Sequence, residues 1–242
     1  MASDSALTRK KGQGSEENTA EIPGPKIFPI ADNCYFAFAG NAELADLIFE
    51  FIQKRMPVWL DAAASAKLDG SDLALKISKE LRKHFIDKHD YESVYRMDTD
   101  FITLLPLEEG PTALTFGGLF RPSKLSPRRP HITCGTGIQF ADPFLVFLNK
   151  ACGLKEMTVE RARFLAYWLV SHVIDSNTGG VNGPVQMVSL TRGRTGAVPK
   201  VEFDADQMNQ RIGELYRLIG SYVLDDDGPS ARIPLPKPTA TP

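Results

Sequence analysis

The sequence is poor in several features that would assign a protein to a class directly. Its 242 residues carry a formal net charge of only −2 and include just three cysteines and four histidines. Nonspecific binding to nucleic acid or to acidic membranes needs clustered positive charge, so neither is indicated as a partner. The one local basic run, residues 9–11, is expected to be a solvated loop.

The few cysteines and histidines and the short apolar runs exclude further classes. Cys34, Cys134 and Cys152 match neither a disulfide framework nor a CxxC metal motif, which favours a reducing compartment. The histidines show no HxH or HxxxH metal spacing. No window approaches the roughly 18 apolar residues of a spanning helix, and the first residues lack the apolar region of a signal peptide. We therefore expect a soluble, cytoplasmic protein without a metal.

The sequence does contain an alternation of strand and helix patterns. Aromatic-rich runs bounded by turn formers predict strands at 26–30 and 34–40, and Asn41 is expected to cap a helix with an apolar face from Leu44 to Ile52. Further helices are expected at 71–89 with Ser71 or Asp72 as cap, at 139–152, at 158–174 and from 204 onward. Further strands are expected at 100–107, 112–118, 131–134, 185–190 and 198–203, with an irregular stretch at 121–130.

The order of these elements predicts the fold class. Hairpin-joined strands imply antiparallel sheets, and helices that come in two separate groups imply that two different faces are covered. An α+β fold, a four-layer αββα sandwich of two antiparallel sheets flanked by helix pairs, satisfies both conditions. We expect one domain over residues 1–224 and a disordered acidic and proline-rich tail over 225–242.

Four short stretches carry residues suited to chemistry. They are ASDS at 2–5, PKIFPI at 25–30 with AFAG at 37–40, CGTG at 134–137, and DSNTGG at 175–180. Each is weak alone, because a lysine that opens a strand is usually solvated and a GTG is usually a turn. Asp175 alone reads equally well as an acid at a helix end, with Gly179 and Gly180 as the helix stop. His172, on an apolar helix, is expected to be packed rather than catalytic.

Taken in this order, the stretches resemble the proteasome-type family of N-terminal-nucleophile (Ntn) hydrolases over about residues 2–224. The resemblance implies a threonine peptidase subunit with a polypeptide substrate, in a homo-oligomeric ring, with no cofactor. It leaves open whether an ATPase unfoldase feeds the ring. It places the following residues in the site: Asp4, Lys26, Thr136, Asp175 and Thr178 as catalytic support, and Gly135 and Gly137 as oxyanion donors.

These residue types suit the chemistry of an N-terminal hydroxyl nucleophile. The free α-amine can act as its base, because its reference pKa lies near 8. A neighbouring ammonium such as that of Lys26 keeps the amine unprotonated by charge repulsion, and a buried ammonium needs a carboxylate such as Asp4. Asp175, Thr136 and Thr178 are expected to orient the amine and its water, and backbone N–H groups near Gly135 suit an oxyanion.

The family's catalytic threonine opens a strand that precedes the acidic motif, and residues 2–5 correspond to the end of that hairpin. Removal of Met1 exposes Ala2, which has no nucleophilic atom, and the Gly14–Ser15 junction leads into a polar loop sequence. Either Met1 is an internal methionine of a longer reading frame, or the chain lacks the strand and the threonine. We favour the first, because loss of a central strand leaves unpaired backbone in a sheet. A noncatalytic ring subunit and an Ntn amidase for small amides remain the alternative functions.

Overall fold

The computed structural model describes residues 1–3, 6–9, 20–87, 99–125, 131–152, 157–176, 181–191 and 204–224. In chain order they form β1 (Ala2–Ser3), β2 (Ala6–Arg9), β3 (Ala20–Pro23), β4 (Ile27–Ala31), β5 (Cys34–Gly40), α1 (Ala42–Ala66), α2 (Gly70–Leu81), the π-helical turn η1 (Arg82–Ile86), β6 (Thr99–Leu107), β7 (Gly110–Gly117), β8 (Arg121–Lys124), α4 (Ile138–Cys152), α5 (Val159–Asp175), β9 (Gln186–Met187) and α6 (Ala205–Leu224). The fold is mixed α+β with antiparallel strands, as the sequence predicted. Residues 1–203 and 204–242 form two separate compact units.

A five-stranded antiparallel sheet in the order β4-β5-β6-β7-β8 is the main sheet of the first unit. Its central strand β6 buries every second residue from Thr99 to Leu107, and the residues between them are half-buried. This alternation follows from the two-residue period of a strand, which sends successive side chains to opposite faces. Both faces of β6 are therefore at least partly covered.

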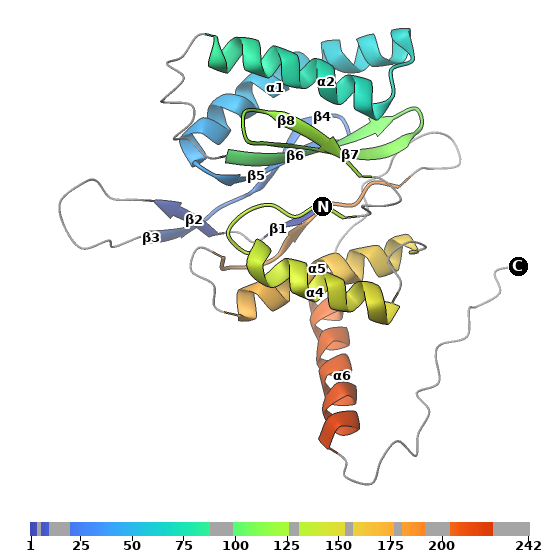
Figure 1. Cartoon of the computed structure of the whole chain (residues 1–242). Helices are drawn as coiled ribbons and strands as arrows, with labels where there is room; N and C mark the ends of the chain where they lie inside the picture. Colours follow the sequence, from blue (N-terminus) through green and yellow to red (C-terminus); the bar gives the residue numbers. More distant parts are fainter. Residues whose placement is uncertain are drawn as a thin grey trace, which may run out of the picture. The chain divides into compact units, whose positions relative to one another are not determined.

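Helices α1 and α2 cover one face of this sheet (Figure 1). Asn41 caps α1 as predicted, because its Oδ1 accepts a hydrogen bond of 2.8 Å from the Leu44 N–H. The core between helices and sheet is aromatic: Phe36, Phe101, Phe116 and Trp59 are fully buried. The hydrophobic effect at this face holds the sheet and the helix pair together.

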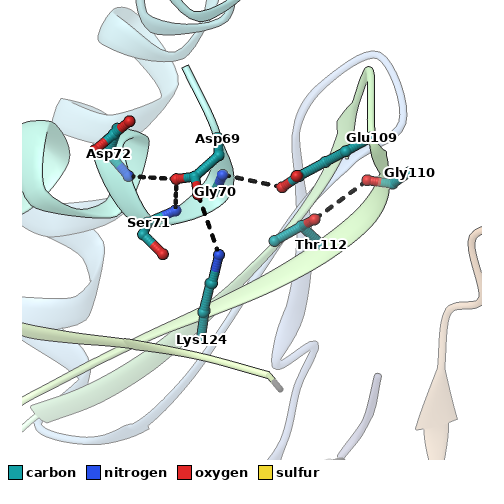
Figure 2. A network of polar contacts seen from close by, with 8 residues as sticks. All are labelled: Asp69, Gly70, Ser71, Asp72, Glu109, Gly110, Thr112 and Lys124. Carbon is teal, nitrogen blue, oxygen red and sulfur yellow. Dashed lines mark hydrogen bonds and ion pairs between the residues drawn. The ribbon is translucent and has the colours of Figure 1, made fainter. Parts of the chain in front are cut away.

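The start of α2 differs from the prediction, since the cap is Asp69 and not Ser71 or Asp72. Figure 2 shows the Asp69 carboxylate accepting hydrogen bonds from the Ser71 and Asp72 N–H groups, at 2.7 and 2.9 Å. These bonds, that from Asp72 first, hold the pKa of the Asp69 carboxyl below its usual value. The Lys124 ammonium lies 3.6 Å from the other carboxylate oxygen, and Glu109 accepts from the Gly70 N–H at 3.0 Å. The helix thus begins against the β6–β7 turn and β8.

The end of this helix and several strands also differ from the prediction. α2 ends at Leu81 and continues as η1, while residues 88–89 of the predicted helix lie outside the described residues. A strand, β8, replaces the irregular conformation predicted for 121–124, because these residues pair with β7. Residues 131–134 form no strand with any described part of the chain. The predicted strand 198–203 and the predicted tail 225–242 lie outside the described residues.

A second group of elements contains β1, β9, α4 and α5. β1 and β9 form a two-stranded antiparallel ladder, and α5 contacts β1. Helices α4 and α5 pack together through aromatic side chains, with Phe144 at 5.1 Å from Trp168 and at 4.3 Å from His172 between ring centroids. In Figure 1 these two helices lie on the other side of the five-stranded sheet from α1 and α2. The stacking of His172 on Phe144 confirms that this histidine is packed.

The second unit contains α6, which begins where the sequence predicted. Asp204 caps it by accepting a hydrogen bond of 3.0 Å from the Gln207 N–H. None of the helices among the described residues has the length and apolarity needed to cross a bilayer.

Two leucines on α2 give a matched test of the core. Leu73 is fully buried and Leu75 is 61% exposed. Leu73→Ala is expected to lower the free energy of unfolding by about 2–5 kcal/mol, because it removes buried methyl groups and leaves a cavity. Leu75→Ala should change it by less than about 0.5 kcal/mol. Urea denaturation measures both, and equal losses from the two variants would contradict the placement of α2 on the sheet.

Candidate functional site

Lys26 lies directly before the edge strand β4, and its backbone is held by a side chain from β9. The Gln186 Oε1 accepts hydrogen bonds from the Lys26 N–H at 2.8 Å and from the Ile27 N–H at 3.3 Å. The Gln186 Nε2 donates to the Gly24 carbonyl at 3.0 Å. We call this set of three hydrogen bonds the Gln186 clamp. It joins the segment before β4 to β9, although the two are far apart in the sequence.

The same strand β9 holds the beginning of the described chain. In the β1–β9 ladder Ser3 pairs with Gln186 and Ala2 with Met187. Met1 extends the ladder, because its nitrogen donates to the Val188 carbonyl and its carbonyl accepts from the Val188 N–H, both at 2.9 Å. Ser3, which precedes Asp4, therefore pairs with Gln186, whose side chain holds the Lys26 backbone. Asp4 itself lies outside the described residues.

The predicted GTG turn lies against the main sheet on one side and against α5 on the other. Gly135 has a φ of 98°, and a Cβ built there would lie 2.9 Å from the Ala39 Cβ of β5. A Cβ on Gly137 would lie 2.6 Å from the Val173 Cγ1 of α5. Both positions need glycine, Gly135 for its backbone conformation as well as for space. Thr136 between them is exposed.

Cys134, which precedes this turn, lies where Lys26 and an unpredicted carboxylate meet. Ala39, on which Gly135 packs, is paired across the sheet with Asp100. Burial, then the negative charge of Asp100, raise the pKa of the Cys134 thiol to about 12, and the Lys26 ammonium opposes this rise. Lys26, Asp100 and the turn that begins at Cys134 are thus close enough to interact electrostatically.

The last predicted stretch lies at the end of α5. Asp175 is the final residue of that helix and is exposed, two residues beyond the Val173 that contacts Gly137. The Ser176 N–H and Oγ–H both donate to the His172 carbonyl, at 3.0 and 2.8 Å, and end the helix. Thr178 lies outside the described residues, so its predicted role is not placed.

The structure therefore brings Lys26 and the Gly135–Gly137 turn into one region, with Asp175 at the end of the helix that this turn contacts. Sequence reasoning missed two neighbours of this region, Gln186 and Asp100, and gave Cys134 of the CGTG stretch no role. The only signal for Gln186 was a polar residue within the apolar run Val185–Val188. A cavity of about 400 Å³ opens beside the clamp between β4, β5 and β9, with Ile27 and Tyr35 in its lining.

The chemistry open to this region is proton transfer and charge stabilisation by side chains. An ammonium, a carboxylate and a glycine-rich turn at the start of a helix can move protons and stabilise a developing negative charge. Among the described residues, His, Cys, Asp and Glu side chains nowhere gather in threes as a metal site requires.

Two glycines test the close approach of the turn to α5. Gly137→Ala forces a contact with Val173 and should lower the free energy of unfolding by about 1–3 kcal/mol. Gly118→Ala is the matched control, because its Cβ has open space, and it should change stability by less than about 0.5 kcal/mol. Thermal or urea unfolding compares them, and a neutral Gly137→Ala would show that the turn does not pack on α5.

The Cys134 thiol provides a chemical test of the same environment. With a pKa near 12 in place of the ordinary 9.0, the fraction of Cys134 present as thiolate at pH 8 falls about a thousandfold. The thiolate is the species that reacts with alkylating reagents. Iodoacetamide should therefore label Cys134 at least about tenfold more slowly in the native protein than in urea, since the higher nucleophilicity of a high-pKa thiolate offsets only part of the loss. Mass spectrometry of the labelled peptide measures both rates. Labelling of the native protein at the rate seen in urea would contradict the described surroundings.

The comparisons with known proteins do not assign the chain to a family. No protein-family model matches the chain, and no curated protein has a significantly similar sequence. What can be said of function therefore depends on the motifs and on the region in which Lys26 meets β9 and the Gly135–Gly137 turn.

Proposed function

We propose that the chain is a subunit of a proteasome-type peptidase that hydrolyses peptide bonds with an N-terminal threonine. In this proposal the threonine opens a strand that precedes residue 1 in a longer form of the protein. The observation that carries the proposal is the meeting of three sequence-distant segments: β1, the segment that carries Lys26, and the turn that follows Cys134. They are joined by the Gln186 clamp, by the β1–β9 ladder and by the contact of Gly135 with Ala39.

The arrangement of elements supports the four-layer αββα sandwich of that family. One helix pair covers the five-stranded antiparallel sheet, and a second pair accompanies the β1–β9 ladder. Among the described residues the ladder contains two paired residues in each strand, extended by the hydrogen bonds between Met1 and Val188, which is short for a sheet that packs between layers. In our proposal the nucleophile strand pairs with β1 and extends this second sheet.

The proposed roles follow from charge and position. Threonine Oγ attacks the peptide carbonyl, and the free α-amine of the same residue takes the hydroxyl proton. The amine gives this proton to the peptide nitrogen as the C–N bond breaks, which releases one product and leaves an ester on Oγ. Water, deprotonated by the same amine, then hydrolyses the ester and restores the threonine hydroxyl. The Lys26 ammonium lowers the affinity of that amine for a proton by repulsion, and Asp4 stabilises the ammonium. Thr136, Asp175 and Thr178 orient the amine and its water, and N–H groups of the turn from Gly135 to Gly137 donate to the oxyanion.

Exposed apolar residues on the helices support assembly into a ring. In the first unit the most exposed of these apolar residues are Leu47, Val58 and Leu75 on α1 and α2, and Val146 and Phe147 on α4. A subunit that contacts its neighbours through helices needs such side chains on the outside of its layers, whereas a monomeric amidase does not. In the proposed form the ring is homo-oligomeric and cytoplasmic, and it encloses a polypeptide substrate.

A reconstruction of the nucleophile tests the proposed reaction. The threonine-led form is the chain preceded by the proposed nucleophile strand and processed so that threonine is its first residue. It should cleave fluorogenic peptides, and Lys26→Ala should lower kcat by at least about a hundredfold, because the amine loses the charge that keeps it a base. The 242-residue chain that starts at Met1 is the inactive reference.

Other outcomes point to the rival functions. A correctly processed threonine-led form that assembles but cleaves no peptide would favour a noncatalytic ring subunit. Cleavage of small amides without cleavage of peptides would favour an amidase. Peptide cleavage that is unaffected by Lys26→Ala would contradict the role given to Lys26.

The assembly is tested separately by light scattering at micromolar concentration. The proposal predicts a particle many times heavier than the 26.7 kDa chain. Phe147→Glu should reduce the particle's mass, because it places a charge on an exposed apolar position of α4. A 26.7 kDa monomer under all conditions would count against the ring.

A further inference from the structure

The Gln186 clamp holds backbone that cannot be held by ordinary strand pairing. Pairing of β4 with β5 begins at Ile27, opposite Ala37. Pro25 has no N–H to donate, and the residues from Gly24 to Lys26 lie outside the β4–β5 pairing. In a regular strand, successive N–H groups point to opposite edges, yet one oxygen of Gln186 accepts from both Lys26 and Ile27. The backbone therefore departs from a regular strand at Lys26, and Gln186 holds it in that conformation.

The Gln186 side chain is not needed for the ladder that contains its own backbone. β9 pairs with β1 through main-chain groups, and its neighbours Val185, Met187 and Val188 are apolar. A buried or half-buried amide in such a run is stable only where its donor and acceptor are both used. Here the amide oxygen accepts from the Lys26 N–H and the amide nitrogen donates to the Gly24 carbonyl. The segment that carries Lys26 therefore explains why a polar side chain is stable at position 186.

The neutrality of the amide matters because it holds the backbone of a charged residue, Lys26. Lys26 and Asp100 both act on the Cys134 thiol, with opposite effects on its pKa. A carboxylate at position 186 could accept the same two N–H bonds, but it would bring another negative charge to the Lys26 backbone. An amide accepts from these N–H groups and donates to the Gly24 carbonyl without competing for the ammonium.

We propose that Gln186 is a positioning residue for Lys26, which fixes the lysine backbone with a neutral amide so that the ammonium faces the turn after Cys134. This inference deepens the proposed function and rests on it for the catalytic consequence. The positional part concerns only the Lys26 backbone and ammonium, and it can be measured in a protein with no activity.

The experiment uses two substitutions and one matched control in the 242-residue chain. Gln186→Met keeps the shape and removes all three hydrogen bonds, whereas Gln186→Glu keeps the two acceptor bonds and adds a charge. Gln210→Met makes the same change on α6, where it removes one exposed hydrogen bond of 3.1 Å to Glu214. Two readouts are taken for each: amide exchange of the peptide that contains Lys26 and Ile27, and the rate at which a soluble acylating reagent labels Lys26.

Gln186→Met should accelerate amide exchange at Lys26 and Ile27 by about tenfold, while peptides from β5 and β6 keep their protection. It should also change the labelling rate of Lys26 by at least about threefold. Gln186→Glu should leave the two amides protected and slow the labelling, because a nearby carboxylate raises the pKa of an ammonium. Gln210→Met should change neither readout. Unchanged exchange in Gln186→Met would overturn the clamp, and faster exchange with an unchanged labelling rate would overturn the positioning of the ammonium.

The catalytic consequence is read in the threonine-led form. Gln186→Met should lower kcat about tenfold or more with KM little changed, and should shift the acidic limb of the pH profile, because Lys26 sets the pKa of the amine. An inactive parent enzyme would reject the proposed function, while the exchange and labelling results would still decide the positioning of Lys26. An active parent whose Gln186→Met variant keeps its kcat and pH profile would overturn the inference.

Discussion

The hydrogen bonds of one neutral side chain, Gln186, connect the segment that carries Lys26 with the second group of elements. The segment from Gly24 to Lys26 leads into the edge strand of the main sheet and lies outside its pairing with β5. The clamp replaces that pairing and joins the main sheet to β9, which in turn pairs with β1. Without it, the lysine that the motifs single out would have no fixed relation to either the chain's first residues or the second group of elements.

Close backbone contact completes the region. Gly135 lies on Ala39, and Ala39 is paired with Asp100, so the turn after Cys134 is positioned by the smallest residues of the sheet. Gly137 lies on Val173 and connects the same turn to α5. Larger side chains at these positions would push the turn away from the sheet or from the helix. The interaction of Lys26 with the turn is therefore a property of the packing as much as of the charged residues.

The sequence predicted the elements whose pattern is periodic and left out those that depend on distant partners. The aromatic alternation of β4 and β5, the Asn41 cap and the apolar faces of α4 and α5 gave their elements to within a few residues. β8 was missed because Arg121–Lys124 has no strand-like alternation and becomes a strand only through its pairing with β7. Within the site, Lys26 and the glycines were identified from motifs. Gln186 and Asp100 could not be, because their relation to Lys26 exists only after distant segments have folded together.

The proposed attack by an N-terminal threonine is tested most directly by finding where a threonine-directed covalent inhibitor attaches to the threonine-led form. Attack by the threonine hydroxyl requires the amine, Lys26 and the turn to meet at one point, which is the central claim. Peptide mapping by mass spectrometry should find a single adduct on the N-terminal threonine and none in the chain that starts at Met1. An adduct on an internal residue, or no adduct on a correctly processed and folded threonine-led form, would contradict the account.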